Sequence, residues 1–152
     1  MAGKLEDLEA VRATVAGVAH HIDAKRWPEL RALFAAEVET DYTSLFGGAP
    51  ERQSGDALVA RWQGLLGPVA CQHLLGPIVV ALESDTATAR CHVRAMHDVP
   101  AAPSGPHWEL LGHYVFELRR QEDGFLITKM KLEGLLQTGN LKLLAEASAR
   151  AG

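Results

Sequence analysis

Hydrophobic residues recur at three- and four-residue spacing through three segments of the first half of the chain, which is typical of amphipathic helices. The first segment runs from Leu5 to about Lys25 and ends there because the Trp27-Pro28 step disfavours helical geometry before the proline. Pro28 suits the first turn of a second helix, predicted at Pro28–Ala35. A third helix is predicted at Ser54–Leu66, with the Ser54 side chain as its N-terminal cap.

Alternation of polar and apolar residues then predicts strands. The alternation in Glu37–Ser44 places Tyr42 on the inward face and Asp41 on the outward face. Four further strands, separated by turn residues, are predicted at Val69–Glu83, Thr86–Val99, Trp108–Arg120 and Phe125–Leu136. A bulge or bend is expected at Gly76-Pro77, and a short helix at Asn140–Arg150.

Small side chains dominate the inward face of the predicted sheet. They are Ala87, Ala89, Cys91, Ala95 and Gly112. Because they leave volume that large side chains would fill, we expect a cone-shaped apolar cavity between the sheet and the helices. Three helices followed by a strongly curved, mostly antiparallel sheet make an α+β fold. With no repeat or linker in the sequence, one domain is predicted over residues 1–152.

Composition narrows the function classes. The chain has 15 basic and 19 acidic side chains, a net charge of −4, and no run of Lys or Arg that would favour nucleic acid as a partner. The first residues of the chain lack the apolar segment of a signal peptide, and no run of apolar residues is long enough to cross a membrane. A cytoplasmic protein is expected. The two cysteines, Cys71 and Cys91, are expected to be reduced and buried.

Four polar residues are predicted to face the cavity: Asp23, Tyr42, His73 and His97. A carboxylate that accepts one ring N–H of a histidine fixes the tautomer and stabilises the imidazolium that forms on proton abstraction. Asp23 can do this for His73, which would act as a general base, while Tyr42 and His97 hold a substrate oxygen. Each residue also has a structural alternative: a helix-end carboxylate, a core histidine, a packed tyrosine and a histidine near the surface.

Three segments carry a resemblance to a known family: IDAKRWPELRALFAAEVETDY, CQHLLG and HYVFELRRQEDGFLITKMKL. Together with the order of elements, they resemble the SnoaL-like division of the nuclear-transport-factor-2-like (NTF2-like) superfamily, and within it scytalone dehydratase and related dehydratases. The resemblance implies a cone-shaped barrel and an Asp23–His73 dyad, with Tyr42 and His97 as further active-site residues. The sequence departs from scytalone dehydratase at three positions. Ile22 stands where that enzyme has a tyrosine, and the serine and asparagine of that enzyme correspond to positions near Gly112 and Tyr114.

We therefore expect a cofactor-independent lyase that eliminates water from a hydrophobic cyclic oxygenated molecule such as a polyketide, steroid or terpenoid. The predicted substrate-binding residues are Ile22, Trp62, Trp108, Gly112, Tyr114, Phe116 and Met130. A ketosteroid-isomerase-like isomerase and a non-catalytic ligand-binding or dimerisation domain remain as alternatives. Epoxide hydrolysis is disfavoured because Arg90 and Arg94 lie on the strand face opposite His97.

The remaining histidines have no spacing typical of a metal site, so no metal is predicted. His20 and His21 are adjacent and point in different directions on a helix. His92 and His113 fall on the outward faces of their strands, where apolar and charged residues mix as in a moderately polar interface. A homodimer or small homo-oligomer is expected.

Overall fold

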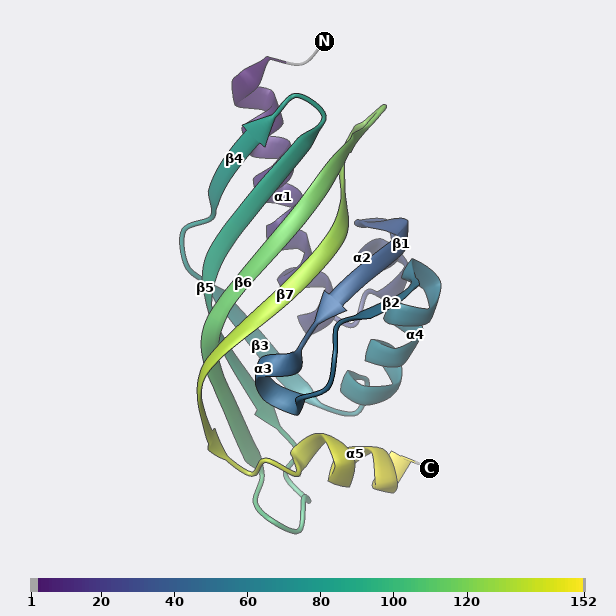
Figure 1. Cartoon of the computed structure of the whole chain (residues 1–152). Coiled ribbons are helices and arrows are strands. Elements are labelled where there is room, and N and C mark those ends of the chain that lie inside the picture. The colour runs from purple at the N-terminus through teal and green to yellow at the C-terminus, as the bar shows by residue number, and fades with distance from the viewer. Residues whose placement is uncertain (1–2, 152) are drawn as a thin grey trace.

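A strongly curved seven-stranded sheet forms the frame of the molecule, as the computed structural model, which describes residues 3–151, shows (Figure 1). The strand order is β2-β1-β7-β6-β5-β3, and β4 also pairs with β5. The strands are β1 (Phe34–Asp41), β2 (Glu51–Ser54), β3 (Ala70–Leu75), β4 (Val79–Glu83), β5 (Thr86–Asp98), β6 (His107–Gln121) and β7 (Gly124–Gly139). Only the β1–β7 pair among these is parallel. The mixed, curved sheet confirms the predicted α+β fold.

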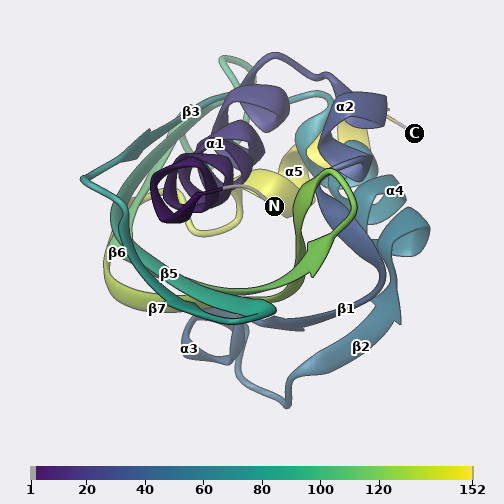
Figure 2. The same cartoon turned by 90° about the horizontal axis from the view of Figure 1, so that it is seen from above.

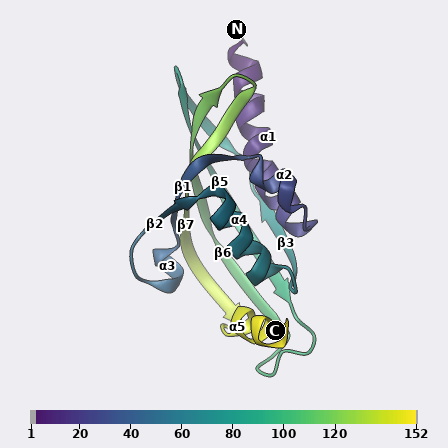
Figure 3. The ribbon, with the colours of Figure 1, turned by 90° about the vertical axis from the view of Figure 1, so that its right-hand side faces the viewer.

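Most of the helices lie within the curve of this sheet. The helices are α1 (Lys4–Asp23), α2 (Trp27–Arg31), α3 (Thr43–Phe46), α4 (Gly55–Leu66) and α5 (Leu143–Ala151). Figure 2 shows α1, α2, α4 and α5 on the inner side, and Figure 3 shows α5 at the end of the sheet remote from the N-terminus. The predicted stripe of α1, including Val11, Val15 and Ile22, is buried there. Within residues 3–151, no helix has both the length and the apolar character needed to cross a bilayer.

The second helix is shorter than predicted. It ends at Arg31, and Phe34 begins β1 instead of the last turn of a helix. Phe34 is paired with Ile127 of β7, the Ile127 N–H donates to the Leu33 carbonyl at 2.9 Å, and the phenyl ring is buried. Pairing with a distant strand therefore overrides the local helical spacing.

The strand carrying Tyr42 also ends early, at Asp41. The Asp41 carboxylate accepts hydrogen bonds from the Thr43 N–H at 3.0 Å and the Thr43 hydroxyl at 2.6 Å, which turns the chain into the one-turn helix α3. Ser44 fixes α3 to β7, because its hydroxyl donates to the Leu132 carbonyl at 2.7 Å. The sequence predicted neither α3 nor the short edge strand β2.

The expected break at Gly76-Pro77 is confirmed and separates β3 from β4, which pair with successive parts of β5. The inward face of β5 is confirmed as well, since its small residues, including Ala89 and Ala95, are buried. Gly112 lies beside a register shift of β6, where an added Cβ would stand 2.3 Å from the Glu133 carbonyl oxygen. Only glycine allows the two strands to approach this closely.

Candidate active site

Asp23 and His73 are in direct contact, as predicted. Asp23 is the last residue of α1, and His73 lies in β3. The Asp23 Oδ1 atom is 2.7 Å from His73 Nδ1, and Oδ2 accepts the His73 backbone N–H at 2.8 Å. The carboxylate therefore binds the ring and the main chain of the same residue in another element. Because a carboxylate only accepts, Nδ1 carries the proton of this hydrogen bond, and Nε2 is the ring nitrogen that Asp23 does not bind.

His97 is the second imidazole of the site. It lies on β5, 5% exposed, and its ring is 5.7 Å from the His73 ring at an interplanar angle of 88°. Its Nδ1 is 3.2 Å from the Trp108 carbonyl oxygen, and its ring stacks on Trp108 with a centroid distance of 4.3 Å. A carbonyl only accepts, so Nδ1 carries the hydrogen and Nε2 is an open acceptor when the ring is neutral. His97 thus lines the same cavity as His73 and is not a surface histidine.

The two imidazoles have opposite electrostatic environments. Burial lowers the pKa of His73, but the hydrogen bond and charge of Asp23 outweigh this and raise it to about 9. Burial and the nearby charge of His73 lower the pKa of His97 to about 4. Burial raises the pKa of Asp23, yet the hydrogen bonds from His73 bring it below its usual value. At neutral pH, Asp23 is therefore an anion, His73 a cation and His97 neutral.

A cavity of about 260 Å³ opens beside these histidines. Of the predicted residues, those that line it are Ile22, Tyr42, Trp62, His73, His97, Trp108, Tyr114 and Met130. Asp23 lies behind His73 and orients it without lining the cavity. Gly112 and Phe116 do not line it either: Gly112 packs against the backbone of β7, and the Phe116 ring is buried in the core.

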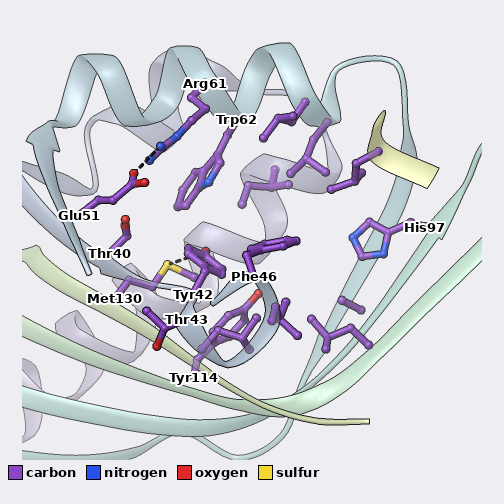
Figure 4. A pocket seen from close by; sticks show the side chains of 18 of the residues that line it. Thr40, Tyr42, Thr43, Phe46, Glu51, Arg61, Trp62, His97, Tyr114 and Met130 are labelled. Atoms are coloured by element: carbon purple, nitrogen blue, oxygen red, sulfur yellow. Dashed lines mark hydrogen bonds and ion pairs between the residues drawn. The ribbon is translucent and has the colours of Figure 1, made fainter. Parts of the chain in front are cut away.

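Two tyrosines bring hydroxyl groups to the cavity wall. The Tyr42 hydroxyl is 3.8 Å from the Met130 sulfur, a weak acceptor, so it remains available to a ligand (Figure 4). Tyr114 lies close by, with its ring centroid 5.6 Å from that of Phe116. Burial raises the pKa of Tyr42 and that of Tyr114, which keeps both phenols neutral and able to donate. Tyr42 follows β1 instead of belonging to it, but it points inward as expected.

Sequence reasoning missed Lys25 and Cys71. Lys25 has a positive φ of 58° just after α1, and its ammonium donates to the Leu66 and Val69 carbonyls at 2.7 and 2.6 Å. It is also 3.4 Å from Cys71 Sγ, which lies 3.6 Å from Asp23 Oδ1. Cys71 shares a face of β3 with His73, and this parity could have indicated its place. Lys25 gave no signal, because its position depends on a left-handed turn.

Asp23, Cys71 and His73 also form a cluster whose ligand atoms all lie within 4.8 Å of one another. The set fits a metal poorly, because Asp23 Oδ1 and His73 Nδ1 already share a hydrogen bond at 2.7 Å. The Lys25 ammonium, 3.4 Å from the Cys71 sulfur, would repel a cation. The absence of a metal stays a prediction.

The other histidines lie away from the cavity. His92 and His113 are on the outer face of the sheet, as predicted, with ring centroids 4.6 Å apart. His20 is exposed and His21 half-buried near the end of α1. Further lining residues include Thr40, which the alternation in Glu37–Ser44 places on the same face as Tyr42. They also include Phe46, Glu51, Arg61 and Leu144, which the sequence did not indicate.

Known structures share this fold over nearly the whole chain. The Kfla4162 protein from Kribbella flavida is 28% identical, with a TM-score of 0.87 over 94% of this chain and 99% of that one. A candidate scytalone dehydratase from Novosphingobium aromaticivorans is 20% identical, with a TM-score of 0.77 over 90% and 89%. A hexachlorocyclohexane dehydrochlorinase, LinA type 2, is 11% identical, with a TM-score of 0.76 over 90% of each chain. The last two likenesses concern the fold alone.

A search of curated protein sequences finds no significant match. The SnoaL-like domain family matches residues 3–131, which include Asp23, His73 and His97. This match and the fold confirm the resemblance read from the sequence. The chain belongs to the SnoaL-like domain family and has the NTF2-like fold.

Proposed function

We propose that the protein is a cofactor-independent lyase that eliminates water from a small hydrophobic cyclic molecule bearing oxygen. The observation that carries the proposal is the 2.7 Å contact between Asp23 Oδ1 and His73 Nδ1 at the wall of a mostly apolar cavity. The family includes dehydratases, and a candidate scytalone dehydratase shares the fold.

In the first assignment of roles, the deprotonated form of His73, which is increasingly populated as the pH approaches 9, uses Nε2 to remove a proton from a carbon next to a carbonyl group. The electrons of the broken C–H bond form a carbon–carbon double bond, and the bond from the neighbouring carbon to its hydroxyl group breaks. The departing hydroxide takes a proton from Tyr42 and leaves as water. Asp23 stabilises the imidazolium that forms, and a positioned base of this kind contributes about 10²–10⁴-fold to the rate.

The opposite environments of the two histidines support a second assignment of roles within the same reaction. Asp23 raises the pKa of His73 to about 9, so the imidazolium is ready to donate a proton to the leaving hydroxyl. The pKa of His97 is lowered to about 4, so its Nε2 is free to accept the carbon proton at neutral pH. Both assignments need Asp23 and His73, only the second needs His97 for a proton transfer, and the two differ in their dependence on pH.

The size of the cavity narrows the substrate. Its volume of about 260 Å³ falls just below the range of about 300–1,000 Å³ that is common for ligand pockets. This favours a molecule of one or two rings, such as a small polyketide or terpenoid, over a four-ring steroid.

Isomerisation is the second candidate, and the weak partner of the Tyr42 hydroxyl favours it. A phenol that is 3.8 Å from a thioether sulfur can donate instead to an enolate oxygen, while a histidine moves the proton between two carbons. Isomerisation leaves the product mass unchanged, whereas dehydration lowers it by one water.

The test is a thermal-shift screen of one- and two-ring hydroxyketones and phenols, followed by mass spectrometry of the products. His73→Ala and Asp23→Asn are expected to lower turnover at least about 100-fold while circular dichroism stays unchanged. His92→Asn, on the outer face of the same sheet, serves as the matched control and should keep full turnover. Unchanged turnover in the His73 variant would remove the proposed base, and binding without turnover would favour a ligand-binding domain.

A further inference from the structure

Arg61 brings a positive charge to the cavity wall. It lies on α4, and among the described residues that line the cavity it is the only lysine or arginine. Figure 4 shows Arg61, Glu51 and Thr40 at one end of the cavity and His97 at the other. The cavity therefore has two polar ends separated by an apolar middle, and the reacting histidines occupy only one of them.

The partner of Arg61 in the protein holds it weakly. Arg61 Nη1 is 2.6 Å from Glu51 Oε2, but the two side chains are 44% and 60% exposed. Exposed ion pairs contribute little to stability, because water screens them. A guanidinium has five N–H donors, and within residues 3–151 Glu51 is the only side chain or carbonyl that accepts a hydrogen bond from Arg61. Most of its donors are thus free for a ligand.

The charge of Arg61 acts toward the cavity as well as toward solvent. Burial raises the pKa of Tyr42, and the positive charge of Arg61 partly opposes this rise. Thr40, buried to 3% exposure, adds a hydroxyl at the same end. The Gln53 side-chain amide donates to Thr40 Oγ1 at 3.2 Å, which leaves the hydroxyl hydrogen of Thr40 available to a ligand.

We propose that Arg61 and Thr40 bind a carboxylate of the substrate at the end of the cavity remote from the histidines. The planar fork of a guanidinium matches the two oxygens of a carboxylate, and the ligand would take the place of Glu51 on Arg61. The substrate class is then a cyclic carboxylic acid whose reacting carbon lies toward His73. This inference rests on the proposed function for the position of the reacting carbon, but the carboxylate site itself is a matter of binding.

The alternative is that the ion pair between Arg61 and Glu51 has a purely structural role as a clamp, that is, a contact that holds β2 against α4. A clamp would make Arg61→Gln and Glu51→Gln equally destabilising and would leave ligand preference unchanged. A carboxylate site predicts opposite effects of the two changes, because Glu51 competes with the ligand for Arg61. The two variants therefore separate the readings.

The experiment measures binding of 2-naphthoate and 2-naphthamide by isothermal titration calorimetry. These probes have the same size, and only one is charged. We expect the protein to bind the carboxylate at least tenfold more tightly, with a preference that declines as salt increases. Arg61→Gln should abolish the preference and leave amide binding unchanged, and Glu51→Gln should strengthen carboxylate binding.

Arg94→Gln is the matched control. Arg94 forms an exposed ion pair of the same length, 2.6 Å, with Glu109 on the outer face of the sheet, and its loss should not alter either affinity. Equal binding of the two probes, no binding of naphthoate, or an undiminished preference in Arg61→Gln would overturn the proposal.

Repeating the titrations in His73→Ala separates this inference from the proposed function. That variant should lose turnover and keep the preference for the carboxylate. If His73→Ala keeps turnover while the preference still depends on Arg61, the proposed base is wrong and the carboxylate site stands.

Discussion

The imidazole rings of His73 and His97 lie 5.7 Å apart and nearly perpendicular, and their surroundings shift their pKa values in opposite directions. Asp23 stabilises the charged form of His73, and burial beside that charge stabilises the neutral form of His97. A pair of titratable groups whose pKa values are driven apart can supply an acid and a base at the same pH.

This relationship predicts the pH dependence of kcat/KM. If His73 is the base, its active form is neutral, and the rate rises with pH until it levels off near pH 9. If His97 is the base and His73 the acid, the active form needs neutral His97 and protonated His73. The profile is then a bell with a plateau between about pH 4 and about pH 9.

Asp23→Asn gives the control for this profile. Without the carboxylate charge, the pKa of His73 falls, so the limb near pH 9 should move to lower pH under either assignment. A profile whose limb stays in place in this variant would show that His73 does not cause it.

Lys25→Met should destabilise the protein. The ammonium of Lys25 binds the Leu66 and Val69 carbonyls at the end of α4, and its loss leaves both without this donor. We expect the free energy of unfolding to fall by about 1–3 kcal/mol in urea denaturation. Lys142→Met, at an exposed position, should change it little. A loss in Lys25→Met no larger than the small change in Lys142→Met would show that the two carbonyls find other partners.

Ala95→Leu should fill the cavity beside His73. Ala95 is 1% exposed, lines the cavity and is the register partner of His73 between β3 and β5. The larger side chain occupies substrate volume, so ligand binding and kcat/KM should fall at least about tenfold while the melting temperature is kept. Ala81→Leu, at an exposed position of β4, should have neither effect. Full ligand binding in Ala95→Leu would place the substrate elsewhere.

Gly112→Ala should destabilise the contact between β6 and β7. The new Cβ would stand 2.3 Å from the Glu133 carbonyl oxygen, which belongs to the backbone and cannot move aside easily. Overpacking of this kind costs about 1–3 kcal/mol. Gly64→Ala is the matched control, because its Cβ meets nothing within 4 Å on α4, and alanine should stabilise that helix by roughly 0.5–1 kcal/mol. Chemical denaturation of both variants gives the comparison, and a stable Gly112→Ala would contradict the packing argument.

The homodimer or small oligomer stays a prediction. The outer face expected to form the interface carries His92, Arg94, Met96, His113 and Val115 on β5 and β6. If this face pairs two copies, Val115→Glu should shift the protein to a monomer in sedimentation velocity experiments. Leu5→Glu, at a 70% exposed position of α1, should not. A wild-type monomer would refute the expectation directly.

The long elements could be predicted because their burial pattern is local. The stripe of α1 and the alternation of β5 follow from spacing along one element, and the inward position of His97 followed from the same alternation. The pairing of Asp23 with His73 could be predicted because the end of a helix and the face of a strand each restrict the direction in which a side chain points.

The missed features depend on contacts between distant segments. Phe34 begins β1 because it pairs with Ile127 of β7, a strand far along the chain. The short helix α3 depends on the hydrogen bond from the Ser44 hydroxyl to the Leu132 carbonyl. Lys25 reaches Cys71 because its backbone adopts a left-handed conformation, and nothing about a lysine at this position predicts that conformation. Arg61 neighbours Trp62 on α4, where helical spacing alone does not separate a solvent-facing residue from one at a cavity mouth.

The dyad joins the last residue of the first helix to a strand that lies 50 residues further along the chain. Neither element holds the pair alone, and the Asp23 carboxylate also binds the main chain of β3. Any loosening of the helix from the sheet therefore separates the two groups before the rest of the sheet opens. Loss of activity under mild denaturant should then report the detachment of one helix, well ahead of global unfolding.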